Sequence, residues 1–244
     1  MNCSACLLVA ALTFSVRLSA AQTAAPVQTP IDAITFADSR EVYVPLRLTG
    51  ERLGLPVNFD TQKGGVTLGS HAVHIGAQLY DGTSLISLQQ LKGEGVQVDA
   101  DQSVKGWMLK STTESLPVRL GAKRIVVDIA KQELDAYQGE TLVFSSHVST
   151  GRSGKSTPIG SFTIGPIKEK MHLSALYNFA HMPWSVQVNH NIFIHGFATV
   201  PTTPASHGCI RLPIPAAKWF FSWVEVGDSV VVTGQWRAPD TQGR

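Results

Sequence analysis

The chain has 244 residues, of which 43% are hydrophobic and 16% are charged, and its net charge is +2. This length allows two small domains or one large one, and the composition excludes a disordered or collagen-like chain. The basic residues are scattered and form no block, so we expect no nucleic-acid partner.

The first residues have the pattern of an export signal. An apolar run, LLVAALTFSV (7–16), precedes RLSAAQTA, whose small residues suit a cleavage site. No Lys or Arg precedes the run, and it is too short to span a bilayer as a helix. We expect residues 1–21 to be a signal peptide and the protein to be exported to the periplasm or cell envelope. The alternative is a frayed N-terminal helix.

Signal cleavage would leave one cysteine in the chain. Cys3 and Cys6 precede the apolar run and would be lost with it, whereas Cys209 would remain. A lone cysteine cannot form an internal disulfide, and an unused thiol is a liability in an oxidising compartment. Export therefore favours a chemical role for Cys209.

Two similar patterns follow an expected linker at residues 22–30. EVYVPLRLTGERLGLPVNFD (41–60) predicts a strand, a short helix that stops at Gly54, and a second strand. SLISLQQLKGEGVQVDADQ (84–102) repeats this order, and residues 64–80 between them alternate as strands do. The sequence therefore predicts a small α+β domain of two degenerate repeats.

The segments YVPLR and LGLPVNFD in the first repeat resemble the stalk-like domain at the N-terminus of copper amine oxidases, which many bacterial envelope proteins reuse. We assign residues 31–112 to such a domain and residues 113–122 to a linker. Copper chemistry does not follow, because His71 and His74 lie on opposite faces of a strand. The domain could contact glycan strands or an envelope protein, or act as a spacer.

The rest of the chain predicts a mainly β domain with few helices, a sandwich or barrel, at residues 123–234, with a tail at 235–244. One helix is expected at residues 213–227, with a core stripe of Ala217, Phe220, Phe221 and Val224. The expected strands are residues 124–130, 133–138, 141–151, 185–189, 191–196 and 229–234.

Reactive side chains gather in IHGFATVPTTPASHGCIRLP (194–213). Nucleophilic cysteine chemistry needs a thiolate, a base and N–H donors for a tetrahedral oxyanion. Cys209 can be the nucleophile and His195, at a strand end, the base. The backbone N–H groups of Gly208 and Cys209 can be the donors. Arg211 can bind a substrate carboxylate and favour the thiolate.

Cys209 has two alternative roles. It could be a buried core residue, or it could bind zinc together with His195 and His207. No fourth zinc ligand is obvious, so we expect no metal and no cofactor. A catalytic thiol should be alkylated rapidly below the ordinary thiol pKa of about 8.5, and a core thiol should not. The remaining histidines of this half that fit no motif are expected at the surface or in loops: His172, His181 and His190.

Three motifs, in order, resemble the L,D-transpeptidase catalytic domain family. HGFATVPTTPASHGCIRL is similar to its signature of a histidine, a loop and Ser/Thr-His-Gly-Cys followed by Arg or Asn. STGRSGKSTPIGSFTI (149–164) matches the family's Thr-Pro-x-Gly-x-Phe segment. HMPWSVQVNHNIFIHG (181–196) matches its Met-Pro-aromatic stretch. The resemblance covers residues 123–234.

The resemblance implies a role for each residue of these motifs. Cys209 would be the nucleophile, and His195 the base, oriented by the backbone carbonyl of Gly196. His207 and Gly208 would line the site and help form the oxyanion hole. The implied substrate-binding residues are Ser206, Arg211, Gly196, Met182, Pro183 and Trp184, with Met182 to Trp184 bordering the donor groove.

The resemblance also implies the reaction, which is transpeptidation of peptidoglycan stem peptides. Cys209 would attack the carbonyl of the third stem residue, D-Ala would leave, and an amine of a second stem would convert the thioester into a 3–3 cross-link. With water as the acceptor the enzyme would be an L,D-carboxypeptidase, and with a lipoprotein lysine it would anchor proteins. A non-catalytic wall-binding protein is the alternative from another class.

Overall fold

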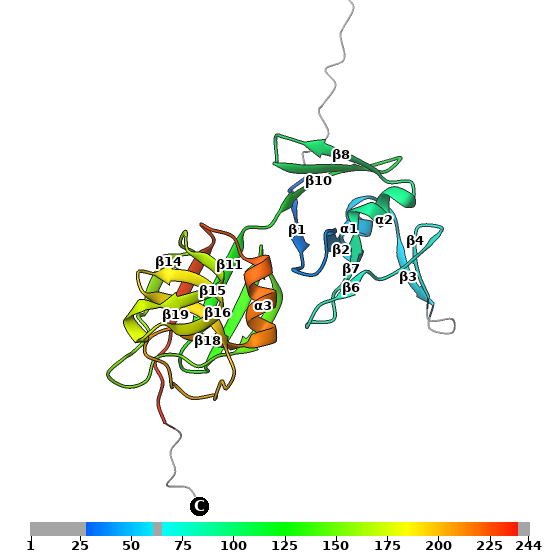
Figure 1. Cartoon of the computed structure of the whole chain (residues 1–244). Helices are drawn as coiled ribbons and strands as arrows, with labels where there is room; N and C mark the ends of the chain where they lie inside the picture. Colours follow the sequence, from blue (N-terminus) through cyan, green and yellow to red (C-terminus); the bar gives the residue numbers. More distant parts are fainter. Residues whose placement is uncertain (1–27, 61–64, 239–244) are drawn as a thin grey trace, which may run out of the picture.

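The computed structural model describes residues 28–60 and 65–238. The expected signal peptide, Cys3, Cys6 and the end of the expected tail lie outside these residues. Within them, no helix has both the length and the apolar character needed to cross a membrane. Figure 1 shows two lobes, which we call the N-terminal lobe (residues 28–120) and the C-terminal lobe (residues 123–238).

The N-terminal lobe contains the repeat that the sequence predicts. Two strands that pair with each other in antiparallel fashion, β2 and β7, begin the two units. The first unit is β2 (Val42–Pro45), α1 (Leu46–Arg52), β3 (Val57–Asp60), β4 (Gly65–Leu68) and β5 (His71–Val73). The second unit is β7 (Ser84–Ser87), α2 (Leu88–Gly93), β8 (Gln97–Asp101), β9 (Gly106–Lys110) and β10 (Ser115–Leu120).

β1 (Ile31–Thr35) and β6 (Ala77–Gln78) complete a seven-stranded sheet with the order β6-β7-β2-β1-β10-β9-β8. β3, β4 and β5 form a separate three-stranded sheet. His71 and His74 are exposed, as expected for residues without a ligand role.

The expectation of a linker at residues 113–122 is wrong for most of that segment. Residues 115–120 form β10, which lies inside the seven-stranded sheet between β1 and β9. Leu116 and Val118 on this strand are completely buried. The sequence did not predict this strand, because Leu116 and Val118 alternate over only three residues and have polar neighbours. Pro117 between them also argues against a strand, since proline is depleted in strands and is rarely found in the middle of a sheet.

The C-terminal lobe consists of two sheets and α3 (Ile214–Trp223), which confirms the mainly β fold class. One sheet has the order β13-β12-β11-β19-β14 and the other β15-β16-β17-β18. The bounds in the first sheet are β11 (Lys123–Asp128), β12 (Glu133–Gln138), β13 (Thr141–His147), β14 (Gly160–Thr163) and β19 (Ser229–Thr233). Those in the second are β15 (Lys168–Ser174), β16 (Ala180–Asn189), β17 (Ile192–Phe197) and β18 (Ile210–Pro213).

The helix α3 packs on β16 and β17 with the stripe that the sequence predicts. Ala217, Phe220 and Val224 are completely buried, and Phe221 is half-buried. The helix ends before the expected residue 227, because Val224 already has an extended backbone.

Each lobe has its own hydrophobic core, and the core of the C-terminal lobe extends into the N-terminal lobe. Ile34, Tyr43 and Leu85 of the N-terminal lobe belong to the same buried cluster as Phe220 and Trp223 of α3. The chain crosses between the lobes at Gly121, where a Cβ would lie 2.5 Å from the backbone nitrogen of Gly139. A side chain at residue 121 would clash with this backbone, so the close approach requires glycine.

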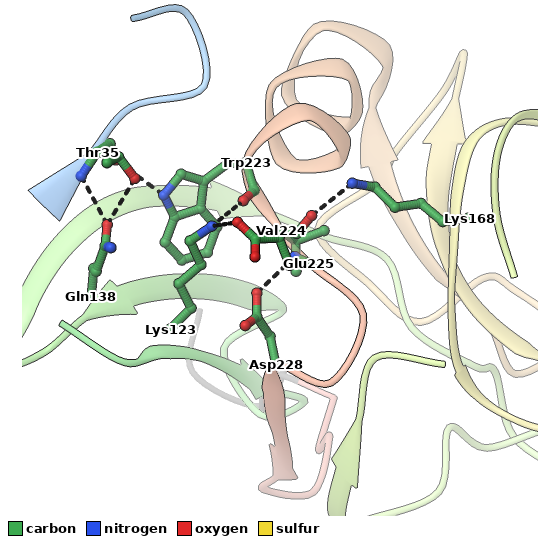
Figure 2. A network of polar contacts seen from close by, with 8 residues as sticks. All are labelled: Thr35, Lys123, Gln138, Lys168, Trp223, Val224, Glu225 and Asp228. Atoms are coloured by element: carbon green, nitrogen blue, oxygen red, sulfur yellow. Dashed lines mark hydrogen bonds and ion pairs between the residues drawn. The ribbon is translucent and has the colours of Figure 1, made fainter. Parts of the chain in front are cut away.

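Hydrogen bonds from Thr35 to Gln138 and Trp223 also connect the two lobes, and we call this contact the interlobe joint (Figure 2). The side-chain carbonyl of Gln138 accepts from the Thr35 backbone N–H at 2.8 Å and from the Thr35 hydroxyl at 3.1 Å. The indole N–H of Trp223 donates to the Thr35 carbonyl at 3.1 Å. Buried polar groups that are paired in this way stabilise a joint and fix its geometry.

Two lysines hold the C-terminal end of α3 in the same network. Lys123 Nζ donates to the Trp223 carbonyl and to Glu225 Oε1, both at 2.7 Å, and Lys168 Nζ donates to the Val224 carbonyl at 2.7 Å. Burial lowers the pKa of Lys168. Cations are favourable at a helix C-terminus, where carbonyl groups lack helical partners.

Candidate active site

The site is built on β17 and β18, which run parallel with Ile194 opposite Ile210 and His195 opposite Arg211. Strand alternation places His195 and Arg211 on one face and the two isoleucines on the other. Both isoleucines are completely buried in the core. The core therefore fixes the two strands, and their other face presents the polar side chains.

Cys209 lies immediately before β18 and is 8% exposed. It packs against Met182 and Phe193, and its Sγ is 3.8 Å from the carbonyl oxygen of Asn191. Burial raises the pKa of the Cys209 thiol, and the Phe193 backbone and the Arg211 charge offset this in part. The thiol is therefore protonated near neutral pH.

The turn before Cys209 is held by two hydroxyl groups. Ser206 Oγ donates to the Cys209 carbonyl at 2.5 Å and accepts from the Gly208 N–H at 3.0 Å. Thr157 Oγ1 donates to the Gly208 carbonyl at 2.8 Å. Gly208 has a φ of 121°, which side chains rarely tolerate. The Gly208 N–H, one of the expected oxyanion donors, is thus occupied by Ser206.

His195 is 4% exposed, and its Nδ1 donates to the Gly196 carbonyl at 2.9 Å. This bond is the one that the family resemblance implied, and it leaves Nε2 as the basic nitrogen. Burial lowers the pKa of His195 to about 4, against the effect of the Gly196 carbonyl and together with the charges of Arg211 and His172. His195 is therefore neutral at pH 7 and can accept a proton.

The side chain of Arg211 has one N–H group, that of Nε, without a hydrogen-bond partner among the described residues. Its guanidinium lies 4.0 Å from the centre of the Phe197 ring, and its Nη1 donates weakly to the Ala205 carbonyl at 3.4 Å. Its Nε is buried, and no acceptor reaches it within the described residues. A buried donor without a partner costs free energy, so this group is suited to receive an anion.

His207 follows Ser206, and its ring contacts Arg152 and Tyr177. Its Nε2 accepts from Arg152 Nη2 at 2.8 Å, and its ring lies 5.1 Å from that of Tyr177. Desolvation and the Arg152 charge lower the pKa of His207. Tyr177 belongs to the short helix η1 (Ala175–Tyr177) between β15 and β16, and its hydroxyl donates to the His207 carbonyl at 3.3 Å.

The structure separates the three residues expected at the donor groove. Met182 contacts the Cys209 cluster, whereas Pro183 lies beside Gly196, whose missing side chain would face α3. Trp184 packs against Phe221 of α3, and its place at the donor groove stays a prediction. Trp184 has a φ of 55°, and this interrupts the alternation of β16.

The expectation for His172 is also wrong. Its ring stacks on Phe193 with 4.6 Å between the ring centres, and its Nδ1 pairs with Glu169 at 2.8 Å. It is half-buried and close enough to His195 for its charge to lower the His195 pKa. His181 and His190 are exposed, as expected.

A zinc site is not assembled by these side chains. Nowhere in residues 28–60 and 65–238 do three or more His, Cys, Asp or Glu side chains gather so as to hold a metal ion. The rings of His195 and His207 are directed at Gly196 and Arg152, respectively.

Two hollows are lined in part by residues that contact the Cys209 turn. One of about 400 Å³ is lined by Asn191 and Phe193, which contact Cys209, and by His172. Another of about 620 Å³ is lined by Arg152 and Thr157, which bond to His207 and Gly208. Sequence reasoning missed Arg152, His172 and Tyr177, which reach the site from distant segments.

Comparison with known proteins finds one family that this part of the chain resembles. Residues 122–232 match the family model of the L,D-transpeptidase catalytic domain. YciB of Bacillus subtilis (strain 168), named as a candidate L,D-transpeptidase, is 29% identical over 131 residues, which are 46% of this chain and 66% of that protein.

Solved structures give similar matches. An L,D-transpeptidase from Stackebrandtia nassauensis is 29% identical, with 47% of this chain and 57% of that chain covered and a TM-score of 0.45. One from Mycobacterium smegmatis is 17% identical, with coverages of 84% and 100% and a TM-score of 0.43. The chain therefore matches less than two thirds of the length of YciB and of the Stackebrandtia chain.

Proposed function

We propose that this protein, whose residues 122–232 belong to the L,D-transpeptidase catalytic domain family, cross-links peptidoglycan stem peptides through a thioester on Cys209. The observation that carries the proposal is the placement of His195, Cys209 and Arg211, whose Nε has no partner among the described residues, on one face of β17 and β18.

The acylation step uses His195 as a general base. Its Nε2 accepts the Sγ proton as Sγ attacks the carbonyl carbon of the third stem residue. When the tetrahedral intermediate collapses, the bond to D-Ala breaks and the imidazolium returns the proton to the departing amine. The products are a thioester on Cys209 and free D-Ala.

The second step regenerates the thiol. An amine of another stem attacks the thioester carbonyl and gives a proton to His195. The bond to Sγ breaks, and Sγ takes the proton from the imidazolium. The product is an amide between the two stems, and the enzyme is unchanged. Water in place of the amine would give a shortened stem, the carboxypeptidase reaction.

The electrostatics favour proton transfer during attack over a pre-formed ion pair. A raised Cys209 pKa and a His195 pKa of about 4 both favour the neutral pair in the free enzyme. The expectation of rapid alkylation below the ordinary thiol pKa therefore does not fit this substrate-free state. We expect alkylation of the free protein to be slow near neutral pH, because only the thiolate reacts.

Two further groups complete the proposed mechanism. Arg211 Nε would bind a carboxylate of the donor stem, which supplies the acceptor that this buried donor lacks. The Cys209 N–H would stabilise the oxyanion, since Ser206 already engages that of Gly208.

The proposed site of action is the periplasm or cell envelope. This part of the proposal depends on the apolar run at residues 7–16 and the small residues after it. Peptidoglycan stems lie outside the cytoplasm, so export and substrate agree.

The product assay tests the reaction. The protein and its Cys209→Ala variant are incubated with purified disaccharide-tetrapeptide, and the products are identified by mass spectrometry. We expect dimers lacking one D-Ala with the unaltered protein and none with the variant. Cysteine-dependent tripeptide monomers alone would make the enzyme a carboxypeptidase. Unchanged substrate with both proteins would contradict catalysis and favour a wall-binding role.

A further inference from the structure

A hollow of about 810 Å³, larger than either hollow at Cys209, lies between the two lobes. One wall is formed by α1 and the β6–β7 turn of the N-terminal lobe, and the other by residues 140–142 of the C-terminal lobe. We call it the interlobe groove. No step of the proposed reaction uses it.

The groove has a fixed shape because the lobes are fixed. Ile34, Tyr43 and Leu85 enter the core of the C-terminal lobe, and Thr35 is bonded to Gln138 and Trp223 (Figure 2). A pre-formed site binds its ligand without having to order two domains first. The groove is thus suited to binding and not only to separating the lobes.

Two aromatic rings lie open in the groove. Tyr80 is 70% exposed at the β6–β7 turn, and Phe59 is 47% exposed at the end of β3. The guanidinium of Arg47 lies 5.5 Å from the centre of the Phe59 ring. Within the described part of the chain, no hydrogen bond or ring contact restrains the Tyr80 side chain. Large exposed rings of this kind mark recognition surfaces.

The charges around these rings exclude several partners. Among the described residues that line the groove, Glu51, Asp81 and Glu140 are anionic and Arg47 is the one cation. This negative balance repels nucleic acids and anionic lipid surfaces. Carboxylates and a guanidinium beside flat apolar rings fit a sugar chain, whose hydroxyl and amide groups form hydrogen bonds and whose C–H faces stack on aromatic rings.

The groove and the catalytic turn lie at opposite ends of one strand. β13 starts at the groove with Thr141 and Leu142, and the chain beyond its end pairs at Ser149 with Arg211. From residue 141 to residue 149 an extended chain covers about 26 Å at about 3.3 Å per residue. A four-residue stem peptide reaches at most about 14 Å. A sugar chain bound in the groove would therefore have to extend toward Cys209 before one of its stems could reach the thiol.

We propose that the interlobe groove binds the glycan strand of peptidoglycan, a chain of linked N-acetylated amino sugars, and holds the polymer whose stem reacts at Cys209. The identity of the sugar chain rests on the proposed function, whereas binding itself requires no catalysis. The N-terminal lobe is then a substrate-binding module and not merely a spacer.

Binding to stem-free glycan strands tests the groove separately from the catalytic site. The full chain carrying Cys209→Ala is titrated with these strands, alone and with Tyr80→Ala, Phe59→Ala or both. We expect binding by the parent and a dissociation constant about tenfold higher for the double variant. Tyr80→Phe keeps the ring and should bind as the parent does. Leu120→Ala, an exposed residue outside the groove lining, is the matched control.

Activity on two substrates gives a second measurement. With Cys209 intact, Tyr80→Ala should react normally with soluble disaccharide-tetrapeptide and more slowly with intact peptidoglycan. No binding of stem-free strands by the parent, equal binding by the double variant, or equal loss on both substrates would overturn the proposal. Glycan binding that needs Tyr80 in a protein without Cys209-dependent products would support the groove and contradict the proposed reaction.

Discussion

The catalytic turn and the interlobe joint are both buried and polar, but they use their polar groups differently. At the joint, Gln138 and Trp223 satisfy the backbone of Thr35 on both sides. At the catalytic turn, Arg211 Nε has no partner, and His195 makes one hydrogen bond through Nδ1. The paired groups of the joint hold structure. The unpaired Arg211 Nε costs free energy of folding and is available to a substrate anion.

The largest effect is expected from removing the base. We predict that His195→Ala lowers kcat by about 10²–10⁴-fold, because Sγ then loses its proton acceptor. The free energy of unfolding should fall by no more than about 1–3 kcal/mol. The variant leaves a small cavity and removes the donor to the Gly196 carbonyl, but it breaks no hydrogen bond between the two strands. Steady-state kinetics and denaturant unfolding check the two parts, and a strong loss of stability would contradict the distinction between the two regions.

The pH dependence of stability should reveal the buried His195. Its pKa of about 4 in the folded protein lies below the ordinary value of about 6.5, so the unfolded chain binds the proton more readily. This contribution, up to about 3 kcal/mol, is fully present above pH ~6.5 and is lost as the pH falls toward about 4. Unfolding measured across this range should show a flatter curve for His195→Gln than for the unaltered protein.

Breaking the joint should affect stability and leave the chemistry intact. In Gln138→Leu the backbone N–H of Thr35 loses its acceptor, and we predict a loss of about 1–3 kcal/mol in the free energy of unfolding. Ser222→Ala, an exposed change on α3, should cost less than about 0.5 kcal/mol. A kcat on soluble disaccharide-tetrapeptide that falls with Gln138→Leu would contradict this separation.

The smallest effect is expected from Arg211→Lys. Lysine keeps the charge but cannot present the planar guanidinium donors, so we predict a kcat/KM about tenfold lower, mainly through KM. Arg119→Lys serves as the comparison, because Arg119 is exposed and pairs with Asp32 in the N-terminal lobe. Equal kinetics for Arg211→Lys and the unaltered protein would exclude Arg211 as the carboxylate ligand.

The features that the sequence predicted are those encoded in short segments. Cys209, Gly208 and Ser206 lie in one turn, and the bond from His195 to Gly196 joins neighbouring residues. The repeat of strand, helix and strand was also visible, because each unit carries its own apolar pattern.

The features that the sequence did not predict depend on distant contacts or on backbone details. Trp223 reaches Thr35 across 188 residues, and Arg152 reaches His207 across 55. A positive φ turns Trp184 toward α3, and proline in β10 conceals a strand inside the sheet. Hydrophobic periodicity in the sequence indicates which residues of one helix or strand are buried, but it does not indicate which helices and strands contact each other.

The central claim is that Cys209 carries the acyl group between two stems. The most direct test is the intact mass of the protein after mixing with a tetrapeptide donor whose free side-chain amine is blocked, so that no stem amine can resolve the intermediate. The account predicts the added mass of the tripeptide acyl group on Cys209, its release by hydroxylamine, and no adduct with Cys209→Ala. Cysteine-dependent turnover without this adduct under rapid quenching, or an adduct on another residue, would contradict it.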